Sequence, residues 1–390
     1  MDHDPFLLKL TSFIKPLPSV ADRVLYLARQ DPVDFKELTK VIETDPILST
    51  MIVSLANSPM YNASGRAVDS LDRAIVFLGQ GRIMDSVMAY MTRSIREDST
   101  EEWPLGDLNF WKHCISVAIA ARMLAEKMHI PAADKCFIAG LIHDVGKLAL
   151  LNYDPSAYRT VIEEVVQTKR PIEFIELGAF GVTHANLAGQ ISRHWKLSSH
   201  FMKAISFHHD GPDPITGTLA NVVRSANLLA KIAGYCESGN PYNMITTDLL
   251  VPHPRVNQED IQDILTRLPK MVTDLSTLIL GQKVDPIPVD NETKICVSVG
   301  IGNGEERVLL RYILSALGCE TNFGQLKEDE DAIQVMIMDY LPSVAPEGKH
   351  IIDFQSWREQ QRDIPSNILN IKSLRHWISG KLEDVKAIAV

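Results

Sequence analysis

Apolar residues recur every three to four positions through most of the first 280 residues, a spacing that predicts amphipathic helices. In the stretch that starts at Asp45, for example, Leu48, Ile52 and Leu55 fall on one helical face. Asp45 is suited to cap this helix and Pro46 to begin its first turn. Nothing in the N-terminal part alternates in the manner of a strand, so we expect a mainly helical protein.

The pattern changes after a polar, proline-bearing segment, GQKVDPIPVDNET, which we interpret as a linker. Short β-branched runs such as KICVSV and AIQVMIMDYLP then alternate with helical stretches such as EERVLLRYILSALG. Strands that alternate with helices predict a small α/β unit. The expected division is an N-terminal helical subdomain (1–105), a helical core (106–280), the linker (281–293) and the α/β unit (294–390).

The stretch from Phe137 to Leu151, FIAGLIHDVGKLALL, is almost wholly apolar, which predicts a buried helix. It nevertheless contains the pair His143–Asp144, followed by Lys147. A buried carboxylate is costly unless it is paired, hydrogen-bonded or bound to a metal. Partners for this pair must therefore come from elsewhere in the chain.

Several histidines are placed to supply those partners. Metal sites need imidazole and carboxylate ligands on rigid elements, and a mixed His/Asp set suits iron, manganese or zinc. Helical histidines that are satisfied by hydrogen bonds would give the same spacing, so the pattern alone leaves both interpretations open. The candidate metal ligands are His113, His143, Asp144, His184, His208 and His209.

Composition narrows the function classes. The formal net charge of −10 argues against DNA or an anionic lipid surface as the main partner. The five cysteines are scattered and form no C-x-x-C, which fits free thiols in a reducing cytosol. No signal peptide and no apolar run of membrane-spanning length is visible, so we expect a cytoplasmic location.

Two groups of motifs resemble a known family. IHDVGK at 142–147, with His113 upstream in WKHCISVA, resembles the HD superfamily. The segments PLPSV, DPILSTMIVSLANSPMY and Val68 to Gly79 resemble the HDOD domain, a bacterial signalling module related to the HD and HD-GYP phosphohydrolases. The resemblance covers roughly residues 10–240. It implies an all-helical domain in which an N-terminal helical subdomain packs on an HD-like core.

The resemblance also implies roles for the site residues. HD-GYP phosphodiesterases bind two or three metals through a His, His-Asp, His, His-His, Asp series and hydrolyse cyclic di-GMP. The six candidate ligands follow that order, and Lys147 would contact a substrate phosphate. Asn227, however, stands where the closing aspartate is expected, and DGPDPITG follows His209 in place of a glycine-tyrosine-proline signature. HDOD proteins as a group are regarded as having lost catalysis.

Asp144 and Lys147 are therefore the candidate catalytic residues only if activity survives. The alternative for the His143–Asp144 pair is a buried hydrogen-bonded link between helices. For Lys147 the alternative is a side chain that keeps its charge in water. Arg224 is read either as a phosphate contact or as a solvated helix charge, and we favour the solvated charge.

The C-terminal unit resembles a response-regulator receiver domain, with Asp339 where the phosphorylated aspartate would stand and Pro342 after it. The acidic pair that would hold magnesium is absent, since the first run leads into GIGNG with no acid until Glu305. Lys372 lies too close to Asp339 for the conserved lysine of a complete receiver. We therefore expect a degenerate, receiver-like interaction domain.

Three functions are consistent with these observations. The first is a bacterial signal-transduction protein whose HDOD module does no chemistry and acts through protein partners. The second is a metal-dependent phosphohydrolase acting on a cyclic dinucleotide or nucleotide. The third is a module that binds such a nucleotide without hydrolysing it.

Overall fold

The computed structural model of the chain describes the helical body and the strands that follow it. The described residues are 9–13, 19–27, 34–58, 61–62, 66–98, 104, 106–130, 133–195, 197–209, 217–235, 242–244, 255–280, 295–300, 313–314, 320–322, 333–338, 350–353, 368–370, 374 and 376–382.

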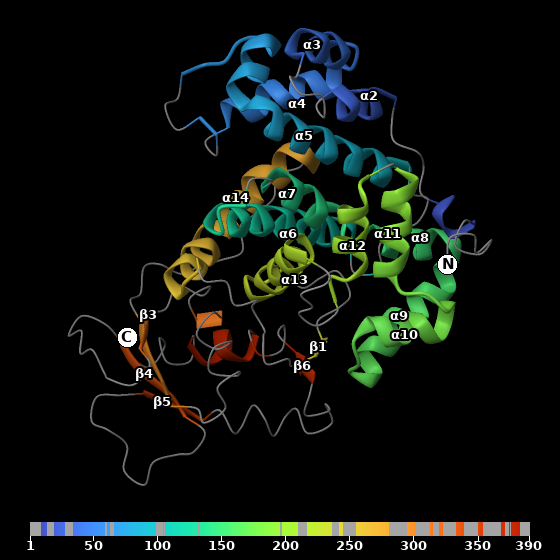
Figure 1. Cartoon of the computed structure of the whole chain (residues 1–390). Coiled ribbons are helices and arrows are strands. Elements are labelled where there is room, and N and C mark those ends of the chain that lie inside the picture. The colour runs from blue at the N-terminus through green and yellow to red at the C-terminus, as the bar shows by residue number, and fades with distance from the viewer. Residues whose placement is uncertain are drawn as a thin grey trace.

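The fold is mainly helical, as the periodicity predicts (Figure 1). The N-terminal helices are α2 (Ser19–Leu27), α3 (Phe35–Glu43), α4 (Pro46–Asn57) and α5 (Leu71–Asp98). The central helices are α6 (Asp107–Lys127), α7 (Ala133–Ile142), α8 (Val145–Tyr153), α9 (Pro155–Thr168), α10 (Ile172–Phe180), α11 (His184–His194), α12 (Ser199–Ser206), α13 (Gly217–Ile232) and α14 (Gln258–Leu280). No helix in the described part of the chain is both long enough and apolar enough to cross a bilayer.

Local signals explain where the N-terminal helices begin and bend. The carboxylate of Asp34 accepts hydrogen bonds from the backbone N–H groups of Lys36 and Glu37 and caps α3. The carboxylate of Asp45 accepts from the N–H of Leu48 at 3.0 Å, as its predicted capping role requires. Gly79 has a φ of 73°, a conformation that glycine adopts readily, and α5 bends there.

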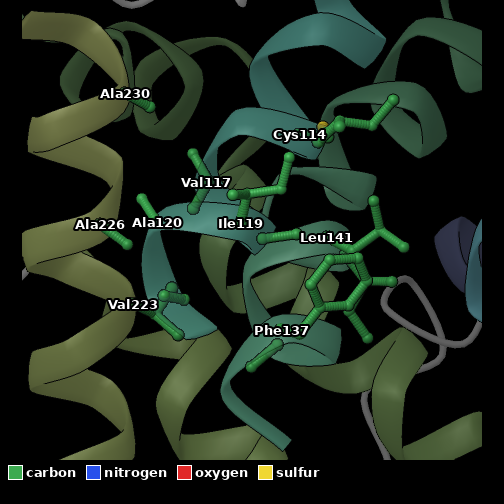
Figure 2. Close-up of a cluster of buried hydrophobic side chains, with 14 of the residues drawn as sticks. Cys114, Val117, Ile119, Ala120, Phe137, Leu141, Val223, Ala226 and Ala230 are labelled. Carbon is green, nitrogen blue, oxygen red and sulfur yellow. The ribbon is translucent and has the colours of Figure 1, made fainter. Parts of the chain in front are cut away.

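The centre of the molecule is a layer of three helices, α6, α7 and α13, whose facing side chains are small or branched. Figure 2 shows Val117 and Ala120 of α6 between Leu141 of α7 and Ala226 of α13. Gly140 allows α7 to approach α6 closely, because a Cβ atom there would lie 2.9 Å from the Ala118 Cα. This layer fixes the positions of His113 on α6 and of the junction that follows α7.

The stretch Phe137 to Leu151 differs from the single helix that its composition predicts. Helix α7 ends at Ile142 and α8 begins at Val145, so the pair His143–Asp144 forms the junction. Asp144 occupies the N-cap position of α8, yet its side chain makes no capping hydrogen bond. The apolar residues on both sides conceal the break, and the carboxylate is directed into the site described below.

Within the described residues the strands form two small sheets. Strands β2 (Ile295–Gly300), β3 (Glu320–Asn322), β4 (Ile333–Met338) and β5 (His350–Asp353) make a parallel sheet in the order β3-β2-β4-β5. Strand β1 (Tyr242–Met244) pairs antiparallel with β6 (Ile368–Asn370). The linker 281–293, Asp339, Pro342, Lys372 and the IGNG turn lie outside the described residues. The receiver-like character of 294–390 and the three boundaries between the four predicted segments therefore stay predictions.

Candidate metal centre

The six candidate ligands come together at one place in the helical core. His113 lies in the second turn of α6, His143 and Asp144 form the α7–α8 junction, and His184 is the first residue of α11. His208 and His209 lie in the turn after α12, which ends at Ser206 and is followed by Phe207. All are at most 1% exposed except His209, whose side chain is 15% exposed.

The Asp144 carboxylate is the centre of the cluster. Its Oδ2 atom lies 3.6 Å from His113 Nε2 and 3.5 Å from His143 Nε2. Its Oδ1 atom lies 3.2 Å from His184 Nε2 and 3.7 Å from His208 Nε2. The two oxygens thus face two different groups of histidines.

Each imidazole is held from behind by an oxygen atom. The Nδ1 atoms of His113, His143 and His208 donate to the carbonyl oxygens of Tyr235 (2.7 Å), Gly140 (2.7 Å) and Ile205 (2.6 Å). Those of His184 and His209 donate to the carboxylates of Glu176 (2.6 Å) and Glu173 (2.5 Å). Carbonyl and carboxylate oxygens only accept, so every Nδ1 carries a proton and every Nε2 faces the cluster, where it offers a lone pair when the ring is neutral.

This tautomer pattern fits a metal site. Ligating histidines almost always donate their other ring N–H to a carboxylate or carbonyl, which fixes the ring. The ligand atoms fall into two groups, Asp144 with His184, His208 and His209, and Asp144 with His113 and His143, with all atoms of a group within 4.8 Å of one another. Within the described residues the buried Asp144 Oδ1 and His208 Nε2 have no hydrogen-bond partner. The cluster could therefore bind a metal.

Close approaches between imidazole nitrogens support the same conclusion. His184 Nε2 and His209 Nε2 are 3.0 Å apart, and His113 Nε2 and His143 Nε2 are 3.3 Å apart. Two unprotonated nitrogens at such distances repel each other through their lone pairs. A cation between them, either a proton or a metal ion, removes this repulsion.

Lys147 contacts the cluster directly. Its Nζ atom donates to Asp144 Oδ2 at 2.7 Å, and the side chain is 1% exposed. The structure thus contradicts the alternative in which Lys147 keeps its charge in water. Arg224 is half-buried on α13 rather than fully solvated. Asn227, on the same helix, is buried, and its Oδ1 has no hydrogen-bond partner within the described chain.

Sequence reasoning missed the two glutamates behind the histidines and a second buried lysine. Glu176 is fully buried. In addition to the hydrogen bond from the His184 ring, its carboxylate accepts hydrogen bonds from the backbone N–H of His184 and from the Tyr158 hydroxyl. Lys231 on α13 is 1% exposed. The available signal was a charged residue within an otherwise apolar helix, as in IEFIELGAF for Glu176.

Burial and neighbouring charges shift the protonation of the cluster in opposite directions. Burial lowers the pKa of His113 to about 3 and also lowers the pKa values of His143, His208 and His209. For His184 the effect of burial is outweighed by the Glu176 carboxylate, which raises its pKa to about 9. Burial disfavours the Asp144 carboxylate, yet His143 and Lys147 hold its pKa well below the usual range.

These shifts predict that the metal-free chain is most stable near neutral pH. His184, with its raised pKa, contributes stability below about pH 6.5 that is lost as the pH rises toward 9. The four histidines with lowered pKa values contribute stability above about pH 6.5 that is lost as the pH falls. We expect the free energy of unfolding in chelator to fall by about 1 kcal/mol from pH 7.5 to 8.5, and more steeply below pH 6.5.

Urea unfolding between pH 5.5 and 8.5 measures this profile. Glu176→Gln removes the charge that raises the pKa of His184 and should flatten the alkaline decline. A wild-type stability that rises steadily up to pH 8.5 would contradict the assignment of a proton to His184.

The fold and the site together define a class of protein. Its members have a helical domain with a histidine–aspartate cluster at the junction of two central helices. Residues 14–211, about half of the chain, match the HDOD domain, and the chain belongs to the HDOD family. No curated protein matches the sequence.

Solved structures share the fold. An HDOD domain protein of unknown function from Geobacter sulfurreducens is 21% identical with a TM-score of 0.50, and the match covers 72% of this chain and 90% of that one. A candidate phosphohydrolase of Shewanella amazonensis is 21% identical with a TM-score of 0.51, over 72% and 93% of the two chains. A candidate signal transduction protein of Marinobacter aquaeolei is 24% identical with a TM-score of 0.56, over 68% and 60%.

Proposed function

We propose that this chain is a signal-transduction protein whose HDOD domain holds a divalent metal in the histidine–aspartate cluster and acts on protein partners without catalytic turnover. The observation that carries the metal is the arrangement of the five imidazoles, each with Nδ1 fixed by an oxygen and Nε2 directed into the cluster. Nitrogen and oxygen donors of this kind suit iron, manganese or zinc.

The metal would connect elements that are distant in sequence. In the larger group of ligands these come from the α7–α8 junction, the start of α11 and the turn after α12. Metal binding that joins several helices adds directly to the stability of the fold that holds them. Metal occupancy can in this way set the conformation that a partner recognises.

Two features support the absence of turnover. The cluster atoms are buried, with His113, His143 and His184 fully inaccessible, whereas a catalytic metal keeps a position open to substrate. Asn227 replaces the aspartate that closes the ligand series of the related phosphodiesterases. An amide supplies no negative charge to a metal.

A metal-dependent phosphohydrolase is the second candidate, and a specific contact favours it. Lys147 lies beside the Asp144 carboxylate, which both groups of histidines share. Its ammonium would there contact the phosphate of a substrate. A bound metal would supply Lewis-acid polarisation of the phosphate and activation of a water. In this reading Asp144 and Lys147 are the catalytic candidates, and a cyclic dinucleotide or nucleotide is the substrate.

We further infer that the C-terminal unit is a receiver-like interaction domain. If its parallel strands are numbered along the chain, their order across the sheet is second, first, third, fourth. This order supports a receiver-like sheet. Asp339 follows the third of these strands in the sequence, as a phosphorylated aspartate would, but the acidic pair for magnesium is missing. The unit would then bind partners without phosphoryl transfer.

Hydrolysis assays on the full-length, metal-loaded chain test this proposal. The substrates are cyclic di-GMP and bis-p-nitrophenyl phosphate, with Fe²⁺, Mn²⁺ or Zn²⁺ present. We expect the wild type to hydrolyse them no faster than the His184→Ala variant, which lacks one metal ligand. Turnover that depends on metal and on His184 would contradict the non-catalytic role and favour the phosphohydrolase. Heat of binding for cyclic di-GMP without hydrolysis would instead favour a nucleotide-sensing role.

A further inference from the structure

The two halves of the cluster differ in their ligands. On the Oδ1 side of Asp144, three imidazoles (His184, His208 and His209) join the carboxylate. On the Oδ2 side, two imidazoles (His113 and His143) join it. We call these the Oδ1 subsite and the Oδ2 subsite. The Oδ1 subsite alone offers a four-ligand set of the number that a tetrahedral metal uses.

Nearby charges strengthen this difference. Behind the Oδ1 subsite stand the carboxylates of Glu176, 2.6 Å from His184 Nδ1, and Glu173, 2.5 Å from His209 Nδ1. At the Oδ2 subsite the imidazoles are held by the neutral carbonyls of Tyr235 and Gly140. Negative charge that can balance a metal is therefore concentrated on one side.

Positive charge is concentrated on the other side. The Lys147 ammonium is 2.7 Å from Asp144 Oδ2, the oxygen that a metal in the Oδ2 subsite would need. The charge of the buried Lys231 also acts on His113 and contributes to lowering its pKa. Among the described residues, the one carboxylate oxygen of the Oδ2 subsite is thus already bound to a cation.

The overall charge leads to the same result. Asp144, Glu173 and Glu176 carry three negative charges, and Lys147 and Lys231 carry two positive charges, among the described residues at the cluster. Binding a metal requires a neutral His184, and with all imidazoles neutral one divalent ion changes a net charge of minus one to plus one. Two ions would leave a net charge of plus three in a buried site, which is strongly unfavourable.

We propose that the chain binds one divalent metal, in the Oδ1 subsite, and that the Lys147 ammonium takes the place of a second metal in the Oδ2 subsite. This inference rests on the proposed metal-binding function and adds its stoichiometry and position. Asp144 then bridges a metal ion and an ammonium group rather than two metal ions.

Metal titration of the full-length chain tests the inference. Chelator-treated protein is titrated with Mn²⁺ or Zn²⁺ by calorimetry, and metal retained after desalting is measured by elemental analysis. We expect one equivalent for the wild type and for His113→Ala, and none for His184→Ala. Lys147→Met, which keeps the length of the side chain without its charge, should raise the content to two.

The outcomes separate this inference from the proposed function. Two equivalents in the wild type, or loss of the metal in His113→Ala with retention in His184→Ala, would overturn the inference and leave metal binding intact. If Lys147→Met binds only one equivalent, the Lys147 ammonium is not what excludes a second metal, and that part of the inference is wrong. No metal in the wild type would overturn the proposed metal-binding function itself. If Lys147→Met fails to fold, the comparison of the two histidine variants still decides the position.

Discussion

Asp144→Asn should remove most of the metal affinity and strongly destabilise the metal-free chain. The substitution takes away the carboxylate that four imidazoles face and that Lys147 contacts at 2.7 Å. Removing one partner of a buried ion pair costs about 3–5 kcal/mol, because the other charge stays buried. Loss of a partner that only orients a ligand already weakens metal binding by about 10- to 100-fold, so loss of the ligand should exceed about 100-fold.

Urea unfolding in chelator and metal titration measure these two effects separately. Asp72→Asn is the matched control, since Asp72 is exposed in the first turn of α5 and should change stability by less than about 1 kcal/mol. An Asp144→Asn variant with wild-type stability and wild-type metal affinity would mean that the carboxylate is not the centre of the cluster.

Gly146→Ala should be the most damaging single-methyl change to the packing around the site. A Cβ atom at this position would lie 2.0 Å from the backbone oxygen of His184 and 2.9 Å from the backbone nitrogen of Ala188. These are backbone atoms of α11, so no side-chain rotation can relieve the overlap, and α8 and α11 must move apart. We expect a loss of about 3 kcal/mol or more, at the upper end of the cost of overpacking.

The same displacement would shift His184, which begins α11, away from Asp144, so metal affinity should fall together with stability. Gly178→Ala is the control, because a Cβ atom there meets nothing within 4 Å on helix α10. Alanine favours a helix over glycine by about 0.5–1 kcal/mol, so this variant should be slightly more stable than the wild type. A Gly146→Ala chain as stable as wild type would contradict the close contact of α8 with α11.

Features that depend on neighbouring residues were predictable from the sequence. The Asp45 cap follows from a short-range signal, and the structure confirms it. Membership of the helical HDOD family followed from several motifs in the right order, and the family match over residues 14–211 confirms it.

Features that depend on distant residues were not predictable. The carbonyl that orients His113 belongs to Tyr235, 122 positions later, and no local pattern in the sequence connects them. The break at His143–Asp144 is concealed because the flanking residues favour a helix on both sides. Lys147 was interpreted without knowledge of its depth, and the structure shows that its ammonium is buried against Asp144.

The central claim is that the histidine–aspartate cluster is a metal site. Anomalous diffraction from crystals of the full-length chain grown with Mn²⁺ or Zn²⁺, recorded above and below the metal absorption edge, tests it most directly. We predict an anomalous peak within coordination distance of Asp144 Oδ1 and the Nε2 atoms of His184, His208 and His209. The absence of an anomalous peak at the cluster would contradict the claim, whether or not the crystals show the metal at another position.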